Sequence, residues 1–334
     1  VGISAGNLTQ TGGAGGGYNT GIGRNTLPAL TTGYYNTAVG ANALSANTTG
    51  IENNAMGVNA LQANTTGQDN IGIGYRSLFT STSTSGNVAV GTQALENMAL
   101  GGDASSQNTA VGHLALTANT FGLYNTGIGA QALNQNTTGN YNVALGRQAG
   151  YNNTTGSNNV FLGELAGYVD SAGGTGNITG SGNVIIGSAQ NMIPSKSGSN
   201  QLNIGNLIFG TSLGTGSTLS TGNVGIGLTG PNAKLQIDNA NAASAQALIL
   251  SNSNSGFAAD EAIYQSFYVG GTGGNEMARI LAANKTATVG SNGYLAFYTR
   301  NADVTAEKVR IDNAGNVGIG TVSPNSLLTI GSAL

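Results

Sequence analysis

The feature that most constrains this sequence is a repeat of 17 residues that fills its first two-thirds. The step is 17 residues except for 21 after Asn87 and 24 after Asn159, where we expect the extra residues, around 101–104 and 173–176, to loop out. A short period that resumes after each interruption is typical of a solenoid. Each unit opens N-x-x-(aliphatic)-G, with the asparagines at Asn19, Asn36, Asn53, Asn70, Asn87, Asn108, Asn125, Asn142, Asn159 and Asn183.

We number the positions of each unit 1 to 17 from this asparagine. Position 4 is always a bulky aliphatic residue, such as Val39 or Val111, and position 2 is often β-branched. Alternate residues share one face of a strand, so both positions are predicted to face the core. Position 3 is mostly Gly or Ala, which predicts that a neighbouring chain approaches the opposite face closely.

Other positions predict how each coil turns. Position 5 is Gly in all ten units, including Gly40 and Gly112, which indicates a positive φ or a tight corner at the end of the strand. Position 9 is usually leucine, as at Leu44 and Leu116, and predicts a second apolar site on a short strand or turn. The opening asparagines are expected to stack as a ladder about 4.8 Å apart, so that ten coils extend roughly 50 Å.

Several coils close with the sequence N-T-T-G, as at 47–50, 64–67, 136–139 and 153–156. These segments match N-x-T glycosylation sequons. They also match turns in which Asn and Thr bond to local backbone and Gly takes a left-handed conformation, which is the interpretation that we favour.

A single coil of this kind has a thin core. It places about three aliphatic side chains inward, and roughly 1.5 to 3 kcal/mol from each barely offsets the ordering of the backbone. Burial against two further copies would supply the missing area, so the chain is predicted to form an intertwined homotrimer.

The last third contains a different duplication. Asn-Val-Gly-Ile-Gly occurs at 223–227 and at 316–320, each followed at the same offset by a proline and an apolar run. The β-rich segments between them predict a β-sandwich-like module that carries acidic residues, including Asp260, Glu261 and Glu307. The predicted organisation is a lead-in (1–17), an all-β parallel β-roll or β-helix shaft (18–200), a junction (201–237), the module (238–315) and a second junction (316–334).

Composition excludes several kinds of chemistry. Charged residues make up 7% of the chain, against roughly 25% in an ordinary domain, the net charge is −3, and there is no cysteine. Nucleic acid and membrane surfaces are therefore unexpected partners, no run is long enough for membrane insertion, and neither disulfides nor zinc–thiolate sites can form. The segments 312–315 and 238–239 lack the ligand density of a calcium site. No cofactor, metal site or enzyme activity is predicted.

The candidate site residues lie mainly at position 17. Tyr18, Tyr35, Tyr124 and Tyr141 occupy it, and they suit either stacking on sugar rings or packing against an adjacent chain. Glu52 and Asp69 occupy the same position in adjacent coils. Such a pair could serve a glycan-cleaving enzyme, although we favour two solvated charges. His113, the only histidine, is expected at an exposed corner.

Two motifs resemble known families. The N-T-A-V-G-x-x-A-L segments at 36–44 and 108–116 resemble the head repeats of trimeric autotransporter adhesins, which implies a left-handed parallel β-roll trimer over about 18–190. The segment G-N-V-G-I-G-T-x-S-P-N-x-x-L at 315–328 resembles the region that precedes the endosialidase-type intramolecular chaperone of phage tail fibres. That resemblance implies a chaperone that assembles the trimer and then cuts itself off after Leu334.

Together these features predict an extracellular, structural and receptor-binding fibre of a virion tail or similar appendage, attached to a cell-surface glycan or other receptor. A bacterial surface adhesin or extracellular filament is the alternative. A glycan-cleaving tailspike is the third and least favoured hypothesis.

Overall fold

The computed structural model describes residues 17–98, 106–169, 178–188, 195–212, 222–232, 234–237, 262–269, 275–284, 293–301 and 304–331. Within these residues the chain is all-β, with strands β1 to β20 and no helix, which confirms the predicted class. The chain divides into two compact units, Val1–Ala245 and Gln246–Leu334.

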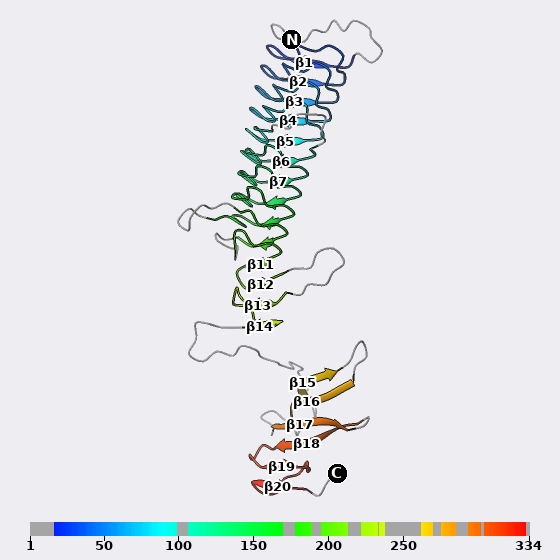
Figure 1. The fold of residues 1–334 in the computed structure, drawn as a ribbon, viewed down its shortest axis with the longest axis vertical. Helices are drawn as coiled ribbons and strands as arrows, with labels where there is room; N and C mark the ends of the chain where they lie inside the picture. Colours follow the sequence, from blue (N-terminus) through cyan, green and yellow to red (C-terminus); the bar gives the residue numbers. More distant parts are fainter. Residues whose placement is uncertain are drawn as a thin grey trace. The chain divides into compact units, whose positions relative to one another are not determined.

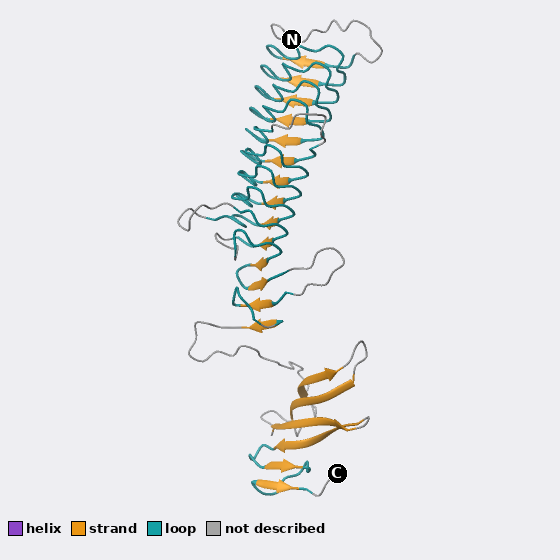
Figure 2. Ribbon diagram, viewed as in Figure 1, coloured by secondary structure: helices purple, strands orange, loops and turns teal. Residues whose placement is uncertain are grey.

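The first unit is the predicted parallel solenoid. Each coil contributes one short strand, and the strands stack along one side of the coils (Figures 1 and 2). Pairing follows the repeat, as in Val39↔Met56, and it survives both breaks, at Val88↔Thr109 and Val160↔Val184. The segments 101–104 and 173–176 lie outside the described residues. The parallel strands are β1 (Thr20–Ile22), β2 (Thr37–Val39), β3 (Asn54–Met56), β4 (Ile71–Ile73), β5 (Val88–Val90), β6 (Thr109–Val111), β7 (Thr126–Ile128), β8 (Val143–Leu145), β9 (Val160–Leu162), β10 (Val184–Ile186) and β11 (Leu202–Ile204).

Our prediction for the two faces of these strands was wrong. Position 3, predicted to face outward, is the buried one, and Ala38 and Ala110 have no exposed surface. Position 4, predicted to face the core, points outward: Met56 is 52% exposed, and Val39 and Val111 are only partly buried. The small residues therefore line the interior of the coil. Its outer face is formed by the aliphatic residues of position 4 and by position 2, which is aliphatic or threonine except at Asn54.

The leucines of position 9 explain this reversal. They are fully buried, as at Leu116, and they fill the space inside the coil opposite the strand. A Cβ added at Gly127, a position 3 residue, would already lie 3.4 Å from Leu116 Cδ1. Where Gly150 replaces the leucine, the bulky Phe161 occupies position 3 and packs so close that a Cβ on Gly150 would lie 2.6 Å from its ring. Interior volume is thus shared between positions 3 and 9.

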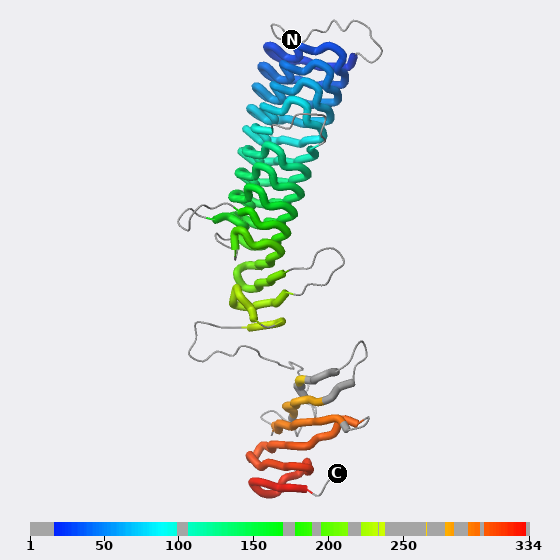
Figure 3. Tube along the Cα trace, viewed as in Figure 1, coloured from blue at the N-terminus to red at the C-terminus, as the bar shows by residue number. Residues whose placement is uncertain are grey.

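Position 9 lies on a turn, not on a second strand. Its leucines adopt a left-handed backbone, with φ of 49° at Leu44 and 51° at Leu116. That conformation costs a non-glycine residue about 1 kcal/mol or more, and burial of the leucine side chain offsets it. The tube in Figure 3 shows coils of similar outline following one another along the first unit.

The glycines of position 5 have the positive φ that was predicted, for example 121° at Gly40 and 138° at Gly112. They also contact the next coil directly, since a Cβ on Gly40 would lie 2.6 Å from the Gly57 carbonyl oxygen. Both conformation and space require glycine here.

The opening asparagines form the predicted ladder, and they are buried from Asn36 onward. The backbone N–H of each opening asparagine from Asn36 on donates to the side-chain oxygen of the opening asparagine one coil earlier. The last member of the ladder is Gln201, and the distances are 2.9–3.1 Å. The side-chain amide also closes the coil, as in Asn36 Nδ2 to the Gly50 carbonyl at 2.8 Å. Asn36 and Asn108 have no exposed surface. The ladder therefore satisfies polar groups that the thin core could not otherwise bury.

We expect Asn125→Ala to lower the free energy of unfolding by about 2–4 kcal/mol, because it removes four buried hydrogen bonds worth roughly 1 kcal/mol each. Asn125 donates to Asn108 and to the Gly139 carbonyl, and it accepts from the backbone and side chain of Asn142. Urea unfolding followed by circular dichroism measures the loss. Asn54→Thr, at an exposed position where other coils have threonine, is the control. Equal stability of the two variants would contradict a structural ladder.

The N-T-T-G segments are turns, as we favoured. Asn47 and Asn64 are fully buried, and Asn47 Nδ2 donates to the Gly50 carbonyl at 3.0 Å. They also form a second ladder, with Asn64 Nδ2 donating to Asn47 Oδ1 at 3.1 Å. Our prediction that Gly takes a left-handed conformation here was wrong, because Gly50 has no positive φ. A Cβ on Gly50 would instead collide with Asn47 Oδ1 and with the Gly67 carbonyl. Crowding requires this glycine.

The duplicated junction forms the same structure twice. After β12 (Ile208–Gly210), which is antiparallel to its neighbours, β13 (Val224–Ile226) pairs in parallel with β14 (Leu235–Ile237). In the second unit β19 (Val317–Ile319) pairs in parallel with β20 (Leu328–Ile330) in the same register, 11 residues apart.

The second unit contains one six-stranded sheet in chain order. Four longer antiparallel strands precede its junction, and no second sheet faces them within the described residues, so a sandwich is not shown. The β-rich run at 247–250, which belongs to the predicted module, lies outside those residues, as do Asp260 and Glu261. The four strands are β15 (Ala262–Val269), β16 (Asn275–Asn284), β17 (Gly293–Asn301) and β18 (Val304–Ile311).

Candidate binding surfaces

The largest candidate surface is the outer face of the solenoid sheet. Positions 2 and 4 form two columns along β1 to β11, and no residue in either column is charged. The position 4 column is aliphatic throughout and substantially exposed: Ile22 is 50% exposed, Ile128 38% and Leu145 51%. We call these two columns the aliphatic face.

The second unit carries an equivalent face. Cross-strand partners in β16 to β20 share one side of the sheet, and they align in two apolar rows. Ile280 and Phe297 are each 36% exposed, and Ile319 is 43% exposed. The rows are Ile280, Phe297, Val309, Ile319 and Ile330, and Ala282, Leu295, Ile311, Val317 and Leu328.

The tyrosines of position 17 border the aliphatic face, since they stand two residues before each strand. They form two stacked pairs: the rings of Tyr18 and Tyr35 are 5.3 Å apart, and those of Tyr124 and Tyr141 are 4.9 Å apart and tilted by 7°. All four have a left-handed backbone, with φ between 57° and 63°. They are 82%, 51%, 38% and 56% exposed in chain order. The structure thus places these predicted candidates on the surface.

Our sequence reasoning missed one exposed aromatic residue of these coils. Phe121 is 53% exposed at position 14, three residues before Tyr124. Most other coils have threonine at this position, as at Thr49 and Thr138. That departure from the repeat is the signal by which the sequence could have identified it.

The acidic pair and the histidine are also at the surface. Glu52 and Asp69 are exposed in adjacent coils, where the backbone N–H of Asp69 bonds to the carbonyl of Ile51. His113 is exposed directly after Gly112, as predicted.

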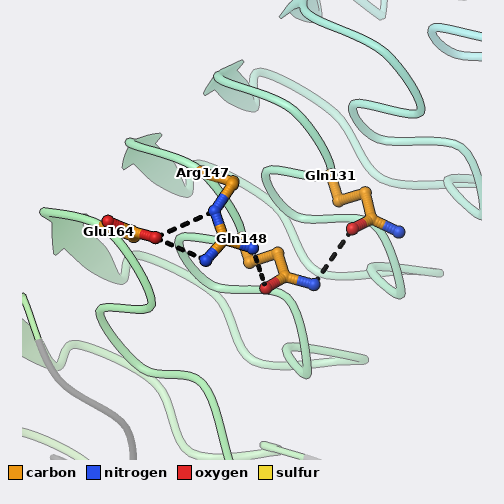
Figure 4. A network of polar contacts seen from close by, with 4 residues as sticks. All are labelled: Gln131, Arg147, Gln148 and Glu164. Carbon is orange, nitrogen blue, oxygen red and sulfur yellow. Dashed lines mark hydrogen bonds and ion pairs between the residues drawn. The ribbon is translucent and has the colours of Figure 1, made fainter.

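Polar side chains link neighbouring coils beyond the strands. Figure 4 shows Arg147 paired with Glu164 of the next coil, with Nε to Oε1 at 2.9 Å, while Gln148 bridges Arg147 and Gln131 at 2.9 and 3.0 Å. Arg147 and Glu164 are about half exposed, so the pair contributes at most about 1 kcal/mol. The groups are satisfied by one another, which indicates a link between coils.

A more buried network lies on the other side of the second sheet, away from its apolar rows. Glu307 accepts two hydrogen bonds from Arg310, both at 2.8 Å, and one from the Tyr298 hydroxyl at 3.0 Å. The Arg310 guanidinium also lies 3.7 Å from the centre of the Tyr294 ring. Burial, which is the larger cause, and the hydrogen bond to Glu307 together raise the pKa of Tyr298 to about 12.

We expect this pKa shift to make the stability of the second unit depend on pH. The phenol titrates near pH 10 when unfolded, so its contribution to stability is present below pH 10 and is lost as the pH rises through about 12. A spectrophotometric titration should show a late-titrating tyrosine that Tyr298→Phe removes. The same late phase in that variant would show that it belongs to another tyrosine.

No acidic cluster suitable for a metal ion occurs in the described part of the chain. Asp312 caps the turn between β18 and β19, accepting from the N–H groups of Ala314 and Asn316 at 2.9 Å. Turn chemistry therefore accounts for segment 312–315. Asp238 and Asn239 lie outside the described residues.

A comparison with protein-family models finds none that matches this chain, and a comparison with curated proteins finds no similar sequence. Among the described residues there is no helix long and apolar enough to cross a bilayer.

Proposed function

We propose that this chain is one subunit of a homotrimeric extracellular fibre, from a phage tail or similar appendage, that holds a receptor-binding surface at a distance and attaches it to a cell. The observation that carries the proposal is the aliphatic face, two uncharged columns that run through every coil.

The size of this face favours a permanent partner. Ten steps between eleven strands at about 4.8 Å extend it over roughly 48 Å. Soluble monomers rarely expose apolar patches larger than a few hundred Å², and larger ones indicate interaction surfaces. Ile22, Met56 and Leu145 are each half exposed, so covering them removes apolar area from water at about 25 cal/mol per Å².

The form of the face favours three copies. Each three-residue strand contributes one outward side chain to each of the two columns. In a cyclic arrangement of three chains, one column contacts each neighbouring chain. Such contacts are heterologous and close into a ring. The second unit supports the same arrangement, because its apolar rows also number two and are equally uncharged.

A fibre that mediates attachment needs surface contacts rather than catalytic groups. The stacked tyrosines offer such contacts, and the exposure of Glu52 and Asp69 at one corner of adjacent coils is that of two solvated charges. A bacterial surface adhesin would use the same coils. The gene beyond residue 334 separates the two: an intramolecular chaperone supports the tail fibre, and a membrane anchor supports the adhesin.

Multi-angle light scattering of the purified chain tests the assembly. We expect a mass three times that of one chain, unchanged over a hundredfold dilution. A stable monomer or dimer would refute the trimer.

A further inference from the structure

We infer that the corner formed by Phe121, Tyr124 and Tyr141 is a binding site for a neutral glycan. This inference rests on the proposed function, since it names the class of receptor that the fibre would contact. Its basis is the exposure of three aromatic side chains in two consecutive coils: Phe121 at position 14 is 53% exposed, and Tyr124 and Tyr141 at position 17 are 38% and 56% exposed.

The geometry leaves one face of the Tyr141 ring open. Tyr124, Tyr141 and Asn158 have the same φ of 57° at the same position of successive coils, so their side chains leave the backbone alike. The near-parallel Tyr124 ring covers one face of Tyr141. On the other side stands the smaller Asn158, and accordingly Tyr141 is more exposed than Tyr124. A flat apolar ring face beside an amide is suited to the C–H face of a sugar ring and to its hydroxyl groups.

Phe121 is an independent observation. The repeat tolerates threonine at position 14 in most coils, and nothing in the packing of the coil requires an aromatic residue there, since Phe121 is 53% exposed. An exposed phenylalanine offers apolar contact and no hydrogen bond. It is three residues before Tyr124, so it adds a second exposed aromatic side chain to the same coil.

The surroundings favour a neutral ligand. Positions 14, 16 and 17 of these coils carry no charged residue, and Asn140 and Ser157 form a polar row beside the tyrosines, with Asn140 N–H donating to Ser157 Oγ at 3.0 Å. The other tyrosine pair differs, because Glu52 and Asp69 follow Tyr35 in its column. Amide and hydroxyl groups around aromatic rings provide hydrogen bonds without selecting a charge.

Saturation-transfer NMR of the full chain tests the site, with oligosaccharides of glucose, galactose and N-acetylglucosamine as probes and a uronic acid oligosaccharide as the acidic comparison. We expect transfer to ring protons of at least one neutral probe. Tyr141→Ala and Phe121→Thr should each weaken this binding roughly 5- to 10-fold. Phe121→Thr restores the residue of the repeat, so it is expected to fold. Tyr75→Ala, which removes a tyrosine 48% exposed beyond the other end of a strand, should leave binding unchanged.

Several outcomes would overturn the inference: no transfer to any neutral probe, transfer to the acidic probe alone, or equal binding by native and variant chains. Light scattering on the same samples separates the site from the assembly. If Phe121→Thr or Tyr141→Ala changes the mass, the corner is a contact between chains and the glycan site is refuted. If the native chain is not a trimer yet binds as expected, the site stands and the trimer fails.

Discussion

Gly129→Ala is expected to destabilise the solenoid by about 3 kcal/mol or more. Gly129 is at position 5 with a φ of 132°, a conformation that strains any residue with a Cβ. The added Cβ would lie 2.5 Å from the Gly146 carbonyl oxygen and 2.6 Å from its carbon, so adjacent coils would have to separate. Thermal and urea unfolding at fixed chain concentration measure the loss.

Gly127→Ala, two residues away, is the matched control. Gly127 is at position 3 of the same coil, where a Cβ would meet Ala132 O at 3.3 Å and Leu116 Cδ1 at 3.4 Å, and where other coils have alanine. We expect its stability to differ from native by less than about 1 kcal/mol. If both variants unfold alike, position 5 does not need glycine for the reason given.

Ile128→Lys, between these two glycines, is expected to dissociate the trimer while the coils stay folded. Ile128 is in the centre of the aliphatic face and 38% exposed, so a lysine there is solvated in a single chain. In the trimer three such ammonium groups would be buried without partners, at a cost of several kcal/mol each. Light scattering should show loss of mass, and far-ultraviolet circular dichroism should retain the β signal.

Thr49→Lys provides the control for this charge. Thr49 is exposed at position 14, outside the aliphatic face, so the variant should retain the native mass. A trimeric Ile128→Lys chain would mean that copies do not meet through this face. A chain that loses its β signal would mean that the face is needed for folding and not only for assembly.

Much of the coil could be predicted from local sequence. Repetition at 17 residues places identical residues one above another, so buried polar groups such as Asn36 and Asn53 must bond to one another along the stack. The glycine of position 5 was predictable for the same reason. The tyrosine pairs of position 17 followed from the period as well, whereas Phe121 could be found only as a residue that departs from the repeat.

The face assignment could not be predicted in this way. Alternation shows that positions 2 and 4 share a face, but not which face is inside, and hydrophobicity pointed to the wrong one. The structure shows that Leu44 and its equivalents reach into the coil from the turn and leave room for little more than alanine behind the strand, as at Ala38.

The sequence by itself therefore determined the period, the ladder positions and the coil-ending glycines, because each depends on residues stacked in register. Only the tertiary structure decided which strand face is buried, why Gly50 is glycine and which side of each unit is left apolar. Those features depend on how side chains from separate parts of a coil compete for one small interior, as the exchange of bulk between Gly150 and Phe161 shows.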